Sequence, residues 1–187
     1  MIVIILRGLI GRWGGFNQTS LKKILTYSSI IHSSWIITVV FHNISIWIFY
    51  FSVYSLISFA LIHLIFFTQI NNIKRLSLLK INFSLIFLFR INILSLGGLP
   101  PLLGFIPKII VIYYLFLTNF SYFIISIIIL SSIIGLFFYL KIIYSLILIN
   151  SSKIRFLRKK FQNKTYNFII SISIFINLIL PILMVGL

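Results

Sequence analysis

The chain has 187 residues, 61% of them hydrophobic and 17% aromatic, with a mean hydropathy of +1.20. Soluble globular domains are nearer half apolar, so this composition excludes that class and indicates an integral membrane protein. The chain also contains 16 Lys and Arg but no Asp, Glu or Cys, which excludes disulfides and thiolate ligation of metals or iron–sulfur clusters.

Taken in chain order, the expected elements are an apolar opening over 1–10, a linker over 11–20, spans over 21–41 and 44–67, a polar loop over 68–77, a largely apolar stretch over 78–99, spans over 102–117 and 122–149, a basic loop over 150–167 and a last span to residue 187. The sequence predicts an all-α, polytopic transmembrane helix bundle of about six or seven membrane segments, forming a single membrane domain over 1–187. If 78–99 and 102–117 are separate crossings, the two loops that carry cations, 68–77 and 150–167, fall on opposite faces of the membrane. The positive-inside rule then gives no clear orientation.

The cations are scattered between the hydrophobic runs. Many strongly basic proteins bind nucleic acid, but here the cations form no patch interleaved with aromatic residues. Lys74 and Arg75, and the run from Lys153 to Lys164, have the positions of juxtamembrane cations that contact anionic headgroups. We therefore expect these charges to have lipids, and not nucleic acid, as partners.

Glycines and prolines interrupt the apolar pattern in the stretch 94–108, LSLGGLPPLLGFIPK. Proline lacks an N–H group and clashes with the preceding turn, and glycine adopts backbone angles that other residues avoid. The residues expected to interrupt the helix are Gly97, Gly98, Pro100, Pro101 and Pro107. The backbone groups freed by such a break must be buried in protein or face water, because each costs several kcal/mol in lipid. The alternative is a simple turn outside the membrane at 97–101.

Lys108 follows this break, about seven positions past Pro101, or roughly 10 Å into the next helix at about 1.5 Å per residue. A lysine at the centre of a membrane helix costs roughly 2.5–3.5 kcal/mol on translocon scales. It must extend to the headgroups, pair with a polar group or lose its proton. Because a proton relay needs a group that gains and loses a proton, a lysine beside a broken helix is a candidate for one.

A second polar stretch, 14–35, begins with two glycines and carries polar residues on several sides of the expected helix. Lys23 and His32 lie nine positions apart, which at about 100° per residue puts them on opposite sides of that helix. Such a helix must be enclosed by other helices, with water or side-chain partners for its hydroxyls. The alternatives are that Lys22 and Lys23 mark the helix end and extend to the headgroups, and that His32 is a hydrogen-bonded core residue.

Three groups of short motifs occur in order along the chain. The first has GGFNQT at 14–19, LKKI at 21–24 and SSI at 28–30 with His32; the second has SLGGLPP at 95–101, GF at 104–105 and PK at 107–108; the third is FFYLK at 137–141. In order and separation they resemble the NADH dehydrogenase subunit 2 family, the antiporter-like membrane subunits of mitochondrial respiratory complex I. The resemblance covers nearly the whole chain.

The resemblance implies a proton pathway along a buried hydrophilic axis that includes Lys23, His32 and Lys108, driven by quinone reduction elsewhere. It implies an enzyme only in the sense of a subunit of NADH:ubiquinone oxidoreductase. NADH, FMN, iron–sulfur clusters and ubiquinone would be bound by other subunits, with no cofactor, metal or redox residue in this chain. The expected partners are other complex I membrane subunits and lipids, and the expected location is the mitochondrial inner membrane, crossed several times.

The chain also departs from the family. The family's subunit is considerably longer, and its N-terminal part carries a membrane glutamate and a further pathway lysine, so we expect this chain to begin inside a helix of the intact protein. No carboxylate in this chain can pair with Lys23. Two other functions stay open: a cation/proton antiporter subunit, and a truncated, non-pumping structural fragment.

Arg7 and Arg12 fall where the family prefers small residues, and an arginine in an apolar segment is costly. The chain also has 2 Met beside abundant Ile. Both features fit an invertebrate mitochondrial gene read in the standard genetic code, in which AGA gives Arg instead of Ser and AUA gives Ile instead of Met. A lineage with ordinary Ile codon usage is the rival explanation.

Overall fold

The computed structural model describes residues 2–16, 18–40, 43–69, 71–72, 83–151 and 177. The helices are α1 (Ile2–Phe16), α2 (Leu21–Val40), α3 (Ile44–Thr68), α5 (Phe83–Gly97), α6 (Phe105–Leu117) and α7 (Tyr122–Ser151). Within these residues the other regular element is an isolated antiparallel bridge between Ser20 and Asn72. The predicted all-α class is confirmed. The predicted basic loop over 150–167 and the last span lie largely outside the described residues.

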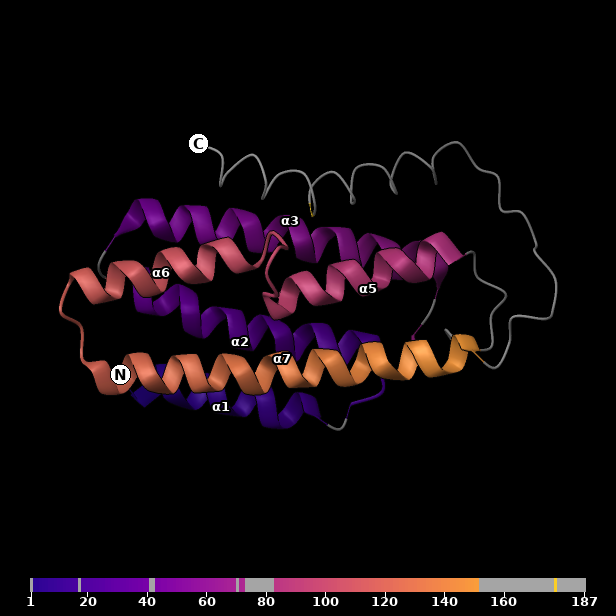
Figure 1. Cartoon of the computed structure of the whole chain (residues 1–187), viewed down its shortest axis with the longest axis horizontal. Coiled ribbons are helices and arrows are strands. Elements are labelled where there is room, and N and C mark those ends of the chain that lie inside the picture. Colours follow the sequence, from indigo (N-terminus) through magenta and orange to yellow (C-terminus); the bar gives the residue numbers. More distant parts are fainter. Residues whose placement is uncertain are drawn as a thin grey trace.

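The helices run back and forth along the long axis of the bundle (Figure 1). α2 and α3 form an antiparallel hairpin, and a 2.9 Å hydrogen bond from Leu21 N to Asn71 O joins the start of α2 to the end of α3. α5 and α6 run in the same direction, one after the other, and together make one interrupted crossing. α3 and α7 therefore finish at the same end of the bundle. The sequence left open whether 78–99 and 102–117 are separate crossings, and the structure shows that α5 and α6 make one crossing together.

Two apolar clusters fill the interior, one toward each end. The cluster at the end where α3 and α7 finish packs α2, α3, α5 and α7 together and includes Leu61, Leu88 and Ile142. The cluster toward the other end joins α1, α2, α6 and α7 and includes Trp35 and Val111. The described residues also bury polar side chains, which we call the polar layer: Arg12, Ser28, His32, Ser34, Thr38, Asn92, Ser95, Lys108, Ser131 and Asn177. Apart from Asn177, these residues belong to α1, α2, α5, α6 and α7.

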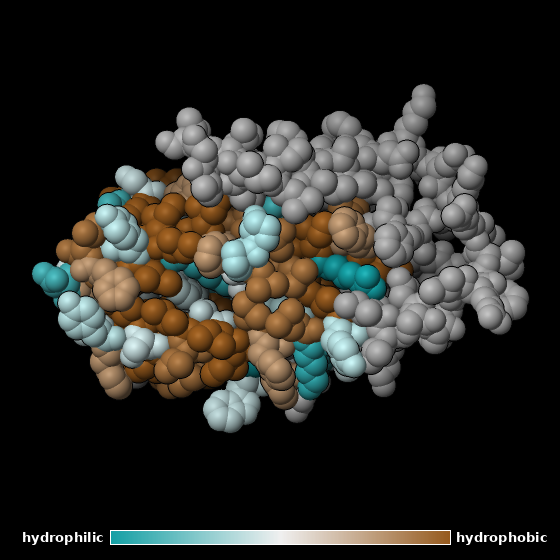
Figure 2. All heavy atoms as spheres, in the orientation of Figure 1, coloured by the Kyte–Doolittle hydropathy of each residue, from teal (hydrophilic) through white to brown (hydrophobic). Residues whose placement is uncertain are grey.

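Two of the described helices are long and apolar enough to cross a bilayer, over Ile44–Phe66 in α3 and Tyr122–Tyr144 in α7. α5 and α6 have 15 and 13 residues, and only end to end do they reach the roughly 20 residues of a crossing. The face of the molecule in Figure 2 is predominantly apolar. Large exposed side chains such as Trp13 and Phe66, 82% and 81% exposed, fit contact with lipid or a neighbouring chain.

The expected linker over 11–20 was wrong for most of its length, because α1 continues to Phe16. Its glycines lie where α1 packs against α2. A Cβ on Gly11 would meet Ile31 Cγ1 at 2.9 Å, and a Cβ on Gly14 would overlap the ring of Tyr27. These glycines therefore permit close helix packing, as small residues do between membrane helices, and they do not end the helix.

Candidate functional site

The break between α5 and α6 begins with a glycine in the left-handed conformation. Gly98 has a φ of 77°, which glycine adopts without steric cost. Its N–H donates to Ser95 O at 3.0 Å, and the next N–H, of Leu99, reaches back to the same turn at 3.4 Å, as in a Schellman motif. Neither bond uses the carbonyls of Leu96 and Gly97, which remain as acceptors at the negative end of the α5 dipole.

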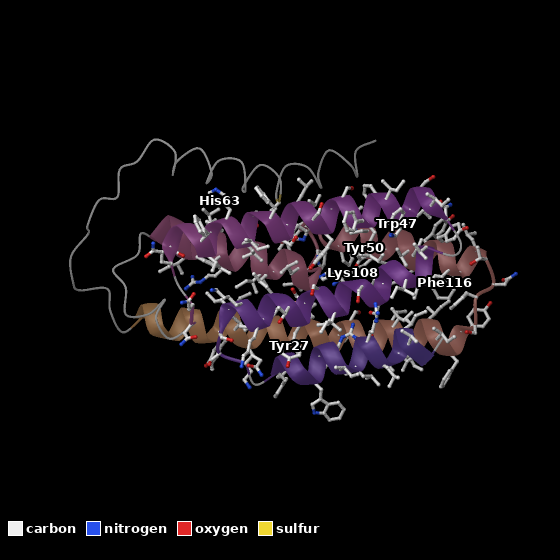
Figure 3. The ribbon with its side chains drawn as sticks, turned by 180° about the vertical axis from the view of Figure 1, so that it is seen from behind. Tyr27, Trp47, Tyr50, His63, Lys108 and Phe116 are labelled. Carbon is white, nitrogen blue, oxygen red and sulfur yellow. The ribbon has the colours of Figure 1, made fainter. Side chains whose placement is uncertain are left out.

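Lys108 occupies this acceptor site. Its side chain is 8% exposed, and Nζ donates to Gly97 O at 2.7 Å and to Leu96 O at 3.4 Å. Because α6 begins at Phe105, Lys108 lies in the first helical turn and not the roughly 10 Å into the helix expected from about 1.5 Å per residue past Pro101. Figure 3 places the residue toward the middle of the bundle. Pairing with backbone carbonyls is therefore how this lysine is accommodated.

The predicted break residues divide into two groups. Gly97 is the last residue of α5, and Gly98, Pro100 and Pro101 lie in the connection, where the peptide bond between the two prolines is cis. Pro107 is the third residue of α6 and does not interrupt that helix, because a proline in the first turn removes no intrahelical hydrogen bond. The helix is therefore broken over 98–104.

Two glycines allow the broken ends to approach each other. A Cβ on Gly98 would lie 2.6 Å from Lys108 Nζ, and a Cβ on Gly104 would overlap the carbonyl oxygen of Ser95. A larger residue at 98 would therefore displace the ammonium, and one at 104 would separate α5 from the start of α6. Glycine at both positions is what brings Lys108 onto the end of α5.

His32 of α2 is buried against α3. Its side chain is 4% exposed, and Nδ1 lies 3.0 Å from the hydroxyl oxygen of Tyr50 in α3. Tyr54 stacks on the imidazole with 4.6 Å between ring centroids. Nε2 has no hydrogen-bond partner among the described residues. His32 and Lys108 are thus both buried, but their hydrogen bonds go to different partners.

Lys23 lies apart from this arrangement. It is the third residue of α2, and its side chain is exposed, like that of Lys22. Both lysines stand at the end of the bundle where α3 and α7 finish (Figure 1). This is the placement expected if the two lysines extend to the headgroups, and the assignment of Lys23 to the pathway stays a prediction.

Sequence reasoning did not single out Asn92, which is fully buried in α5. Its Nδ2 donates to Leu88 O at 2.9 Å, and its Oδ1 accepts a hydrogen bond from Asn177 Nδ2 at 2.7 Å. A signal was present, because an amide inside an apolar run must find its partners within the protein. Asn92 therefore belongs with the groups that define the polar layer.

Arg12 is the least satisfied of these groups. Its side chain is 2% exposed, and Nη1 donates to Gly8 O at 2.7 Å. Nε and Nη2 have no hydrogen-bond partner among the described residues, and a Cβ on Gly135 of α7 would lie 3.3 Å from Nε. With no Asp or Glu in the chain, no carboxylate of its own can neutralise the guanidinium, so an arginine here is costly.

A bundle of this kind, with an interrupted helix and a lysine buried at the interruption, is the architecture of antiporter-like membrane subunits. A chain of the respiratory complex I from Thermus thermophilus with bound Aureothin superposes with a TM-score of 0.75 over 97% of this chain and 42% of that chain, at 20% identity, which shows the shared fold. The family model described as NADH:quinone oxidoreductase/Mrp antiporter, TM, matches residues 1–135. The chain therefore belongs to the NADH:quinone oxidoreductase/Mrp antiporter membrane family.

Two relatives named NADH-ubiquinone oxidoreductase chain 2 extend this comparison. The protein of Anopheles gambiae is 42% identical over 187 residues, which cover 96% of this chain and 52% of that one. The protein of Osphranter robustus is 36% identical over 180 residues, which cover 93% of this chain and 51% of that one. The chain thus spans about half the length of the curated relatives it matches.

Proposed function

We propose that the chain is a proton-translocating membrane subunit of NADH:ubiquinone oxidoreductase. The observation that carries the proposal is a lysine buried at a helix break and held by the carbonyls of Gly97 and Leu96. Membership of the antiporter-like family and the names of the relatives support it. NADH, FMN, the iron–sulfur clusters and ubiquinone belong to other subunits in this proposal, and this chain holds no redox centre.

The residues of the break give Lys108 two distinguishable states. The ammonium form is stabilised by charge-assisted hydrogen bonds to two carbonyls and by the negative end of α5. The neutral amine loses most of that stabilisation, so a change in charge nearby shifts the balance between the two states. Quinone reduction in other subunits supplies that change. Lys23, His32 and Lys108 form the proposed pathway, and the exposed side chain of Lys23 would be covered by a neighbouring membrane subunit.

The distribution of cations indicates an orientation in the membrane. Lys22 and Lys23 open α2 at the end where α3 and α7 finish (Figure 1). In the sequence, α3 is followed by Lys74 and Arg75, and α7 by the basic run that starts at Lys153. The connections at the other end, 41–43 and 118–121, contain neither Lys nor Arg. By the positive-inside rule, we place the basic end on the matrix side of the mitochondrial inner membrane.

Cation/proton exchange is a second candidate, because the matching family model also covers Mrp antiporters. The chain contains no Asp or Glu, and carboxylates are the side chains that hard cations prefer. Vesicles that contain the chain should therefore show proton movement that does not depend on a sodium or potassium gradient. Exchange that requires either cation would favour the antiporter.

The native enzyme complex provides the direct test of membership. Mitochondrial membranes of the source organism are separated on a native gel, and bands are stained for NADH oxidation and analysed by peptide mass spectrometry. We expect peptides of this chain in the NADH-oxidising band, together with other membrane subunits. If the peptides occur only in other membrane fractions, the chain is an antiporter subunit or a structural fragment, and the proposal fails.

A further inference from the structure

A groove between α2 and α3 opens on the surface at the end of the bundle where α3 finishes. Its volume is about 250 Å³, and it is lined by Lys22 and Leu25 of α2 and by Ile62, Ile65 and Phe66 of α3. The two residues of α2 are three positions apart and those of α3 have i, i+3, i+4 spacing, so each helix contributes one face. We call this site the α2–α3 groove. Neither the proposed proton pathway nor the helix break uses it.

The α2–α3 groove lies at the level where a membrane helix meets the lipid headgroups. Phe66 is the last residue of the candidate span Ile44–Phe66, and Lys22 is the second residue of α2. The hydrogen bond from Leu21 N to Asn71 O, at 2.9 Å, holds these helix ends together. A molecule that enters the groove therefore comes from the outer part of the hydrocarbon layer.

The lining of the groove is apolar except for one cation. Ile65 is 8% exposed and forms a buried wall, whereas Ile62 and Phe66 are 54% and 81% exposed, so the groove is open to its surroundings. Lys22 is exposed, and a lysine in such a position covers apolar surface with its methylene groups while its ammonium reaches the headgroup level. The site thus combines an apolar lining with a positive charge at its membrane-boundary end.

The size and charge of the groove limit what it can bind. Sites that enclose a drug-sized ligand have roughly 300–1,000 Å³, so an open groove of about 250 Å³ accommodates a flexible chain and not a whole soluble molecule. The protein has no Asp or Glu to neutralise Lys22, so the counter-charge comes from another molecule. An anionic phospholipid supplies an acyl chain and a phosphate together, in the order in which the groove presents its apolar lining and Lys22.

We propose that the α2–α3 groove is a binding site for an anionic phospholipid, with one acyl chain along the apolar lining and the phosphate paired with Lys22. Lys23 is the next residue, but at about 100° per residue it lies on a different side of α2, and it does not line the groove. A lipid held by Lys22 and not by Lys23 therefore differs from the general attraction of a basic surface to an anionic membrane. The inference concerns lipid binding and does not depend on proton translocation.

Lipid titrations of the full chain in detergent micelles, followed by native mass spectrometry, measure the affinity of each phospholipid. We expect the wild-type chain to bind phosphatidylglycerol more tightly than phosphatidylcholine with the same acyl chains. Lys22→Gln should lower this preference about fivefold, as expected for the loss of one cation beside an anionic lipid, and Lys23→Gln should leave it within about twofold. Equal losses in the two variants, or no preference in the wild-type chain, would overturn the proposal.

A second pair of variants tests the position of the acyl chain. Ile62→Trp enlarges a residue that lines the groove and should weaken the binding of phosphatidylglycerol about tenfold, the effect of exposing about two methylene groups. Phe59→Trp is the matched control, because Phe59 is 69% exposed on the same helix but does not line the groove, and we expect wild-type binding. Wild-type binding in Ile62→Trp would overturn the proposal, because the headgroup alone would then account for the contact.

In the assembled complex, a neighbouring membrane helix is the competing occupant of the groove. Because the chain has no cysteine, Ile62→Cys carries a thiol-reactive benzophenone at one position of this chain. After illumination, mass spectrometry of the peptide around residue 62 should show an adduct with the mass of a phospholipid. A crosslink to another polypeptide, or none, would overturn the proposal.

Discussion

Gly98→Ala tests the geometry of the helix break. An alanine at a φ of 77° costs about 1–2 kcal/mol from the left-handed backbone. Its Cβ would also lie 2.6 Å from Lys108 Nζ, so the ammonium must leave the carbonyls of Gly97 and Leu96. Losing a hydrogen bond to a buried charged group costs about 1.5–3 kcal/mol. Together the two effects should lower the free energy of unfolding by about 2.5–5 kcal/mol.

The assay is reversible unfolding of the chain in mixed detergent micelles, followed by tryptophan fluorescence. Gly97→Ala is the matched control: residue 97 is helical, and its Cβ would meet Tyr139 Cδ2 at 3.3 Å, so we expect a change within about 1 kcal/mol. In a Lys108→Ala background the displaced ammonium is absent, and Gly98→Ala should cost only the backbone part, about 1–2 kcal/mol. Equal effects of the two glycine variants, or the full cost in the Lys108→Ala background, would refute the reasoning.

Three further predictions concern packing, charge and orientation. Gly104→Ala places a Cβ on the Ser95 carbonyl and should destabilise the chain by about 3 kcal/mol or more, which the same unfolding assay measures; near-neutral behaviour would contradict the close approach of α5 and α6. Arg12→Ser removes a buried, partly unpaired charge and should stabilise the chain by about 1–3 kcal/mol. If the gene is read in an invertebrate mitochondrial code, the native protein carries serine there and trypsin does not cleave after residue 12, whereas a native peptide with Arg12 would exclude that explanation. The chain has no cysteine, so an impermeant thiol reagent should label Ser121→Cys in intact mitoplasts and Asn71→Cys only after permeabilisation; the reverse pattern would invert the orientation.

The sequence predicted the fold class and the position of the break because both depend on local chemistry. Long apolar runs specify membrane helices, and the left-handed conformation at 98 is one that glycine adopts without steric cost. Pro107 misled the prediction, since its effect depends on where α6 begins, and a proline in the first turn is compatible with a helix. The glycines at 11 and 14 misled it for a different reason: whether glycine ends a helix or lets another helix approach depends on packing that the sequence does not display.

The candidate site was predictable in its residue types but not in its contacts. A lysine near a helix break had to find polar partners, yet only the folded chain shows that these are the carbonyls of Leu96 and Gly97. The hydrogen bond between His32 Nδ1 and the Tyr50 hydroxyl is a tertiary contact between α2 and α3. No period or motif within either helix indicates it.

The most direct test of the central claim is the number of protons moved per NADH oxidised in vesicles that contain the assembled complex with Lys108→Met. Lys141→Met is the control, because Lys141 is also a cation in a membrane helix but is exposed and lies over the ring of Phe16 at 4.3 Å. We predict that Lys108→Met assembles and oxidises NADH but moves fewer protons, while Lys141→Met keeps the wild-type ratio. A wild-type ratio in the assembled Lys108→Met complex would contradict the account.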